Sequence, residues 1–381
     1  MNVSKERITE LHRKAFVFDF VPLGEPFVMT DRQSKVMRSA LEASLPTPQV
    51  LRRMMNDRLD ELETNVDVRE KIRAAWVGSG VNGVQVTLGG IEFNPGDWNA
   101  ILRDIAHWYR RVCVSDDMSI CCSVDDLLLA AGSNRVGLVL GLQDASAIEK
   151  EIDRLQVLKN FGVRVIQLTF NHRNYIGDGC TEREQSGLST YGVEVVKRMN
   201  ELGIIVDVSH SGSRTTLDAI KVSSCPIAIT HSSCRSITDH PRAKSDDELR
   251  ALRDGDGYFG VLAVPFFLKP EGGAKLQTIV QHVEHAANIV GIDRVGIGTD
   301  WGPWCADFPN EIKERARAQL ASHGFSKKEL PEFGDIIPEL DSWESWPNIT
   351  AALMDRGYSD HEVEGIVGGN WLKFMSRSCL R

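Results

Sequence analysis

Eight apolar, β-branched segments recur along this chain, separated by stretches that are long enough to hold a helix. These segments are Ala15–Phe20, Val81–Leu88, Val136–Gln143, Val163–Phe170, Ile204–His210, Pro226–His231, Tyr258–Val264 and Arg294–Asp300. Near-continuous apolar runs are typical of parallel strands that are buried on both faces. Eight of them, alternating with helices, predict an α/β fold of the (β/α)₈ TIM-barrel type, in which catalytic residues lie at the C-terminal ends of the strands.

The size and charge of the chain exclude several classes of partner. With 381 residues and a formal net charge of −9, the chain lacks the basic footprint that nucleic acids and anionic membranes require. No apolar run approaches the roughly 18 residues of a membrane-spanning helix, and the N-terminus lacks the apolar core of a signal peptide. We therefore expect a cytoplasmic protein with no nucleic-acid or membrane partner, and we leave open whether it forms a homodimer.

The chain is expected to form one domain. No linker rich in Pro, Ser and Gly divides residues 1–381. Residues 30–75 are rich in Arg, Met and Leu at helical spacing, which predicts a helical insertion after the first strand. Residues 305–347 are rich in Pro and acidic residues, which predicts an irregular segment or lid.

Three of the predicted strands end on residues that can bind metal. The fifth ends on His210, the sixth on His231 and the eighth on Asp300. Consecutive strand ends are neighbours on a barrel rim, so both imidazoles can reach one ion, and imidazole suits Zn²⁺ and similar metals. The Asp300 carboxylate can ligate a metal or accept a proton from an attacking water. Each residue alone also fits a structural role, as a histidine bonded to a loop carbonyl or an aspartate that caps a turn.

Two loop residues are candidates for substrate binding. Arg242 follows the sixth strand, and a planar guanidinium near a metal suits a carboxylate or phosphate of the substrate. His172 follows the fourth strand and can donate to a developing oxyanion. The alternatives are a surface arginine and a histidine that braces its own loop.

Short motifs follow one another in a fixed order between Val136 and Phe374. They are Gly141-Leu142-Gln143-Asp144, Leu168-Thr169-Phe170-Asn171-His172-Arg173-Asn174, Gly177-Asp178-Gly179-Cys180, Asp207-Val208-Ser209-His210, Thr230-His231-Ser232-Ser233, His240-Pro241-Arg242, Val295-Gly296-Ile297-Gly298-Thr299-Asp300, Arg356-Gly357-Tyr358-Ser359-Asp360 and Gly368-Gly369-Asn370-Trp371. Together they resemble the membrane (renal) dipeptidase family, peptidase family M19, within the amidohydrolase-type barrels.

This resemblance implies a binuclear zinc dipeptidase. In the family, a His-x-Asp pair after the first strand and an Asp matching Asp300 hold one zinc ion. Two histidines that match His210 and His231 hold the other, and a glutamate bridges the two ions. A loop histidine matching His172 and an arginine matching Arg242 hold the scissile carbonyl and the substrate carboxylate.

The chain departs from the family pattern at the first metal site. If Asp19 matches the acid that precedes the family's Gly-His-Asn-Asp, then Val21 and Leu23 replace the His and Asp ligands. Gln143 stands at the position of the bridging glutamate. Hydrocarbon side chains cannot ligate a metal, and a neutral amide bridges two cations poorly. We therefore expect this site to be lost, which leaves Asp300 without its family metal.

The sequence thus predicts a hydrolase of this type with a reduced site, in which His210 and His231 hold one divalent ion, Zn²⁺, or no ion tightly. The substrate is expected to be small and to carry a carboxylate, as a dipeptide or another small N-acyl amino acid does. The assigned roles are Asp300 as general base, Arg242 and Gln143 in substrate binding, and His172 on the carbonyl. Two alternatives remain: a metal-independent enzyme that cleaves a C–N or C–C bond of a small carboxylated metabolite, and a catalytically inactive binding relative.

Overall fold

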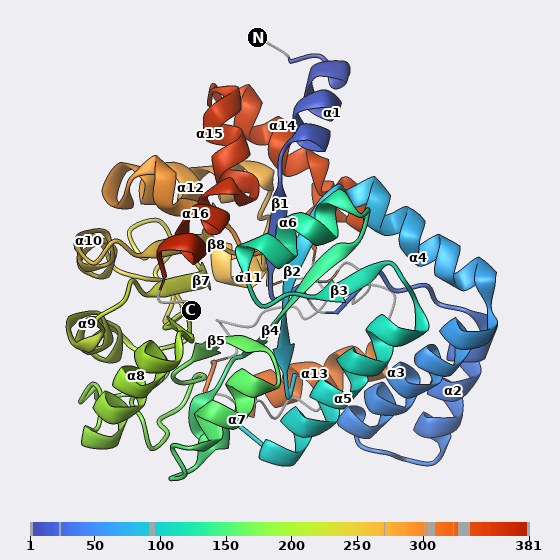
Figure 1. The fold of residues 1–381 in the computed structure, drawn as a ribbon, viewed down its shortest axis with the longest axis horizontal. Coiled ribbons are helices and arrows are strands. Elements are labelled where there is room, and N and C mark those ends of the chain that lie inside the picture. Colours follow the sequence, from blue (N-terminus) through green and yellow to red (C-terminus); the bar gives the residue numbers. More distant parts are fainter. Residues whose placement is uncertain are drawn as a thin grey trace.

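Eight parallel strands form a nearly closed barrel in this computed structural model (Figure 1). The structure describes residues 3–22, 24–90, 96–269, 271–300, 302, 309–322, 324–326 and 336–378. The barrel strands are β1 (Val17–Phe20), β2 (Val81–Leu88), β4 (Val136–Leu142), β5 (Val163–Gln167), β6 (Ile205–Asp207), β7 (Ala228–Ser232), β8 (Tyr258–Val261) and β9 (Val295–Ile297), in this spatial order. Each predicted segment overlaps one of them, so the TIM-barrel prediction is confirmed.

One further strand was not predicted. It is β3 (Met118–Ile120), which pairs with the first half of β4 outside the barrel path. Three residues are too few to show a hydrophobic period, so no sequence pattern marks this strand.

The barrel closes at a seam between β1 and β9. Asp300 N donates to Phe20 O across the seam at 3.1 Å. The buried carboxylate of Asp19 accepts from Thr299 N at 2.7 Å and from Thr299 Oγ1 at 2.8 Å. Trp346 Nε1 donates to the same carboxylate at 3.1 Å. A side chain of β1 therefore holds the end of β9 in place.

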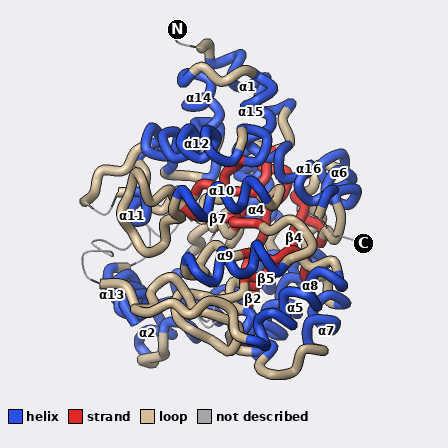
Figure 2. The backbone as a smooth tube through the Cα atoms, turned by 90° about the vertical axis from the view of Figure 1, so that its left-hand side faces the viewer, coloured by secondary structure: helices blue, strands red, loops and turns tan. Residues whose placement is uncertain are grey.

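Helices surround the strands on the outside, as Figure 2 shows. They are α1 (Lys5–Lys14), α2 (Asp31–Glu42), α3 (Thr47–Thr64), α4 (Val66–Ser79), α5 (Trp98–Val114), α6 (Val124–Gly132), α7 (Arg154–Asn160), α8 (Thr190–Leu202), α9 (Ser213–Val222), α10 (Asp246–Asp254), α11 (Pro265–Leu268), α12 (Leu276–Val290), α13 (Asn310–Ser322), α14 (Pro347–Arg356), α15 (Asp360–Glu364) and α16 (Asn370–Arg377). Within the described ranges, none of them combines the length and the apolar character that a bilayer span demands.

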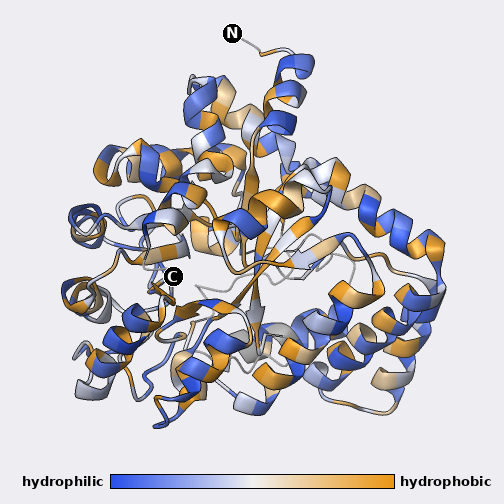
Figure 3. Cartoon of the chain, viewed as in Figure 1, coloured by the Kyte–Doolittle hydropathy of each residue, from blue (hydrophilic) through white to orange (hydrophobic). Residues whose placement is uncertain are grey.

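The N-terminal part of the barrel is filled by aromatic side chains. The ring of Phe20 lies 4.6 Å from that of Trp371 of α16 and 5.7 Å from that of Tyr258, centroid to centroid. Phe18 packs on the same cluster, whereas Val17, the residue before it, joins the larger core beneath the helices. Figure 3 shows the strands as mainly hydrophobic and the outer helices as mixed.

The segments outside the barrel agree with the predictions in part. Helices α2, α3 and α4 cover the range expected to be helical. Helix α13 lies inside residues 305–347, so this part of the segment is helical rather than irregular. Its Ile312 is buried with residues of α2 and α3, and Arg315 pairs with Glu311 one turn earlier at 2.6 Å. The Pro and acidic residues of this segment favour an irregular structure. The helix is stabilised by packing of Ile312 against α2 and α3.

Candidate metal centre

Two histidines and one aspartate meet at the C-terminal end of the barrel. His210 follows β6, His231 lies in β7 and Asp300 follows β9. Their candidate ligand atoms all lie within 4.8 Å of one another, and the two Nε2 atoms are 3.0 Å apart. Both imidazoles are buried, and Asp300 is partly exposed. The structure therefore brings together the three strand-end residues that the sequence singled out.

The other nitrogen of each imidazole is already engaged. His210 Nδ1 lies 2.7 Å from Asn171 Oδ1, and His231 Nδ1 lies 2.9 Å from Thr230 Oγ1. An imidazole ring that donates through Nδ1 keeps a lone pair on Nε2. The two Nε2 atoms face the same space. Two nitrogen donors and a carboxylate form a set that fits Zn²⁺. The side chains present thus fit a divalent ion.

Burial determines the charge of the centre. Burial, helped by Arg242 and Lys244, lowers the pKa of His231 well below its usual value, so this imidazole is neutral. Burial raises the pKa of Asp300 to about 7, although Arg242 opposes the rise. The sequence assigned Asp300 the role of general base, and the structure places its carboxylate within ligand range of both histidines.

The backbone at Asp300 is held in an uncommon conformation. Its φ of 50° is left-handed, and Val21 at the matching end of β1 has a φ of 52°. A non-glycine residue adopts this conformation when its surroundings hold it there. The bonds of Asp19 to Thr299 and of Phe20 O to Asp300 N provide that restraint. The barrel seam therefore sets the direction in which the Asp300 carboxylate points.

Arg242 is fully buried beside the histidines. Its Nη1 donates to Ser209 O, its Nη2 donates to His231 O at 3.1 Å, and the guanidinium lies 5.5 Å from the Phe267 ring centroid. Within the described part of the chain, its Nε has no hydrogen-bond partner. The side chain therefore ties two strand ends together and retains one unpaired donor.

His172 is bonded to α13 and to its own loop. It is exposed, with Nε2 3.0 Å from Ser322 O of α13 and Nδ1 3.4 Å from Thr181 Oγ1. Its neighbour Asn171 is the loop residue that contacts His210. In this arrangement, a role for His172 on a substrate carbonyl requires that it exchange the Ser322 contact for the substrate.

The first-strand positions lie partly outside the described residues. Val21 is buried among the aromatic side chains of the barrel, and its N donates to Gln85 O at 2.9 Å. Leu23 falls outside the described ranges. Gln143 reaches the centre, since its Nε2 lies 3.4 Å from His231 Nε2. No carboxylate of the described chain joins the two histidines other than that of Asp300.

Sequence reasoning missed four residues that support the centre: Asn171, Asp207, Thr230 and Asp19. Asn171 and Thr230 contact the site histidines, and Asp207 contacts Thr230. Asp19 contacts Thr299, the residue before Asp300. No spacing rule reveals these hydrogen bonds. A partial signal exists, because three of the four residues lie within three residues of a predicted site residue. Asp19 stands out in the sequence only as part of the first-strand motif, and nothing there links it to Thr299, 280 residues later.

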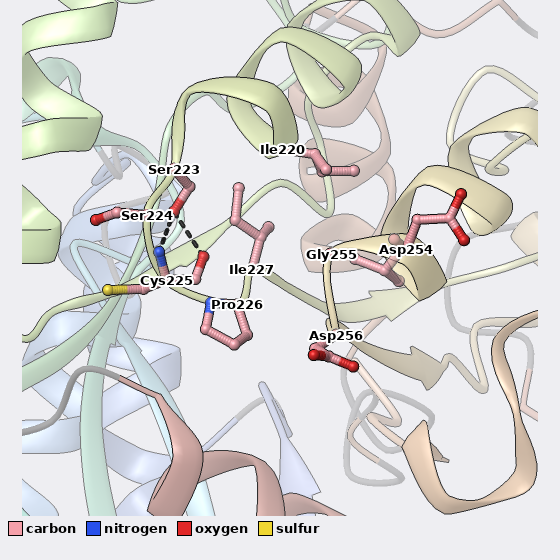
Figure 4. Close-up of a pocket in the computed structure, with 10 residues that line it drawn as sticks. Ile220, Ser223, Ser224, Cys225, Pro226, Ile227, Asp254, Gly255 and Asp256 are labelled. Carbon is pink, nitrogen blue, oxygen red and sulfur yellow. Dashed lines mark hydrogen bonds between the residues drawn. The ribbon is translucent and has the colours of Figure 1, made fainter.

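A separate cavity lies at the opposite end of the barrel. It has a volume of about 260 Å³ and is lined by Ile220, Ser223, Ser224, Cys225, Pro226, Ile227, Leu252, Asp254, Gly255 and Asp256, which precede β7 and β8. Figure 4 shows the Ser223 hydroxyl bonded to Cys225 O and N, at 2.7 and 3.3 Å. Among the described residues that line it, Asp254 and Asp256 can ionise and none is a histidine.

A family comparison agrees with this geometry. The family model of membrane dipeptidase, peptidase family M19, matches residues 11–330. The chain belongs to this family. The match begins before β1, so it includes the first strand and the residues after it, Val21 among them.

Individual dipeptidases share about a quarter to a third of the aligned residues with this chain. Dipeptidase verJ of Clonostachys rogersoniana is 30% identical over 247 residues, which cover 64% of this chain and 55% of that protein. Dipeptidase tcpJ of Claviceps purpurea is 26% identical over 264 residues, which cover 68% of this chain and 55% of that protein. The chain therefore spans about half the length of these curated relatives.

Solved structures share the fold over almost the whole chain. An amidohydrolase from Pseudomonas aeruginosa has a TM-score of 0.73 at 25% identity and covers 97% of this chain and 98% of its own. A metallo peptidase from Rhodobacter sphaeroides, liganded with a phosphinate mimic of the dipeptide L-Ala-D-Ala, has a TM-score of 0.68 at 17% identity and covers 96% and 99%. At this identity, the second likeness concerns the fold.

Proposed function

We propose that this protein is a metal-dependent hydrolase that cleaves a dipeptide or a small N-acyl amino acid with a single divalent ion. The observation that carries the proposal is the convergence of His210 Nε2 and His231 Nε2, 3.0 Å apart, with the Asp300 carboxylate. Membership of the dipeptidase family and the dipeptide mimic bound by a protein of the same fold support the substrate class.

The residues of the chain have separable roles in this proposal. When bound, a divalent ion would polarise the scissile carbonyl and lower the pKa of a water. Asp300, whose pKa burial raises to about 7 in the metal-free chain, would be the general base beside the ion. Arg242 would bind the substrate carboxylate through its remaining donors, and Gln143 would contact the substrate beside His231. His172 would reach the carbonyl after it leaves Ser322.

The proposal of one ion rests on the residues after β1. Val21 offers no ligand atom, and the sequence places Leu23 where the family has its carboxylate. Gln143 stands where a bridging glutamate would be and is neutral. With Asp300 as the available anion, the described residues suit Zn²⁺ as a mononuclear site.

The test is metal analysis of protein purified without chelator, combined with hydrolysis of a panel of dipeptides and N-acyl amino acids. We expect close to one zinc ion per chain and turnover that a chelator abolishes. His210→Ala and His231→Ala should each lose both the ion and the activity, because each removes a ligand. His361→Ala, which changes an exposed histidine of α15, is the matched control and should keep both.

Two outcomes would contradict this proposal. Full turnover after chelation would favour the alternative of a metal-independent enzyme that cleaves a C–N or C–C bond. Stoichiometric zinc without turnover of any compound in the panel would indicate a binding relative rather than a hydrolase.

A further inference from the structure

The carboxylate of Asp207 is buried behind the metal centre and accepts four hydrogen bonds. Oδ1 accepts from Ser209 N at 2.8 Å, from Ser209 Oγ at 2.5 Å and from Thr230 N at 3.3 Å. Oδ2 accepts from Thr230 Oγ1 at 2.6 Å. A hydroxyl has one proton to donate, and this short bond directs the Thr230 proton toward Asp207.

The same hydroxyl contacts the metal centre. Thr230 Oγ1 lies 2.9 Å from His231 Nδ1. When Asp207 is ionised, the hydroxyl proton points to its Oδ2 and the hydroxyl oxygen accepts from the imidazole, so His231 Nδ1 carries the ring proton. His231 Nε2 then presents its lone pair to the space shared with His210 Nε2, 3.0 Å away.

We propose that Asp207 and Thr230 are positioning residues that hold His231 in the Nδ1–H tautomer and so keep Nε2 available for a divalent ion. The inference rests on the proposed function, since the ion is what uses this lone pair. Metal-bound histidines commonly donate their second nitrogen to a carboxylate or carbonyl. Here a hydroxyl stands between the two groups, so the carboxylate controls the tautomer through the direction of the hydroxyl.

Asp207→Asn should reverse that direction. The amide group is best placed with its oxygen at Oδ1, where three donors converge, and its NH₂ at Oδ2, where one hydroxyl faces it. The NH₂ group then donates to Thr230 Oγ1, and the hydroxyl turns its proton toward His231 Nδ1. The imidazole must carry its own proton on Nε2, where it blocks the ion.

Substitutions of Thr230 give an independent test. Thr230→Val keeps the shape of the side chain but removes the hydroxyl, whereas Thr230→Ser keeps the hydroxyl and should rescue the effect. Thr169→Val is the matched control, because Thr169 is a buried threonine after β5 whose Oγ1 lies 3.0 Å from Ser211 Oγ.

The experiment records ¹⁵N chemical shifts of labelled histidines in the metal-free protein, with His231 assigned by its loss in His231→Ala. Zn²⁺ dissociation constants are measured by competition with a chelating dye. We expect Nδ1–H at His231 in the wild type, Thr230→Ser and Thr169→Val, and Nε2–H in Asp207→Asn. Zinc should bind roughly 10- to 100-fold more weakly to Asp207→Asn and Thr230→Val.

The outcomes separate this inference from the proposed function. If the tautomer switches in Asp207→Asn but the wild type binds no zinc, the positioning role stands and the metal-dependent function falls. If the wild type binds zinc while Asp207→Asn and Thr230→Val keep both Nδ1–H and wild-type affinity, the positioning role is overturned. Should Asp207→Asn fail to fold, equal zinc affinity of Thr230→Val and Thr230→Ser overturns it.

Discussion

Asp300 combines two properties that an ordinary surface aspartate lacks. It lies within ligand range of two imidazoles, and burial raises its pKa to about 7. Asp19 and Asp207 add to this rise, and Arg242 opposes it. An aspartate in an unfolded chain has a pKa of about 3.9. Between that pH and about pH 7, the metal-free native state therefore keeps the Asp300 proton, whereas the unfolded state has lost it.

That difference predicts the pH dependence of stability. Between about pH 4 and pH 7 the native state binds more protons than the unfolded state, so the free energy of unfolding falls as pH rises. Asparagine does not titrate. The stability of Asp300→Asn relative to wild type should therefore increase across this window and stay constant above it, by at most about 4 kcal/mol. Urea unfolding with chelator at pH 5 and pH 8 measures this, with the exposed Asp341→Asn as control. An equal difference at both pH values would contradict the raised pKa.

The guanidinium of Arg242 donates two hydrogen bonds to backbone carbonyls of the protein. Arg242→Lys removes a fork that bonds Ser209 O and His231 O and that can bind a carboxylate, and an ammonium reproduces neither. Losing one charge-assisted bond of about 1.5–3 kcal/mol should lower kcat/KM for a dipeptide by roughly 10- to 150-fold. Arg235→Lys, in the same loop, is the control.

The comparison substrate for this prediction is the dipeptide amide, which has no carboxylate. If Arg242 grips the carboxylate, the variant should lose little on the amide compared with the acid. An equal loss on both substrates would show that Arg242 acts by holding the ends of β6 and β7.

At the scale of elements, the seam between β1 and β9 does more than close the sheet. Asp19 accepts from Thr299 and Trp346, and so connects two strands to the start of α14. The next residue after Thr299 is Asp300. A change in these contacts of Asp19 should therefore affect both the stability of the barrel and the position of Asp300.

Asp19→Asn tests this connection. The amide places a donor opposite donors of Thr299 or Trp346, so we expect the free energy of unfolding to fall by about 1–3 kcal/mol. Zinc affinity should fall as well, because Asp300 loses its support. Urea unfolding and dye competition at pH 8 measure the two effects, with Asp125→Asn on the surface of α6 as control. Wild-type zinc affinity in a destabilised variant would show that the joint acts on the barrel alone.

At the scale of the whole molecule, the strand plan was predictable because each strand carries its own local signal. The segments ending at His210 and His231 are apolar over several residues, and parallel topology alone then places their ends on one rim. Helix α13 was harder to predict, because its stability depends on packing against α2 and α3 rather than on a strong periodic pattern.

The sequence by itself determined the barrel, its family and the residue types at the C-terminal rim, because these follow from patterns within short stretches. Only the tertiary structure decided which atoms meet. It brought Asp300 to the histidines, turned two donors of Arg242 onto carbonyls, engaged His172 with Ser322 and placed Asp207 behind His231. These contacts join residues far apart in sequence through bonds a few ångströms long, and such distances depend on how the closed barrel packs.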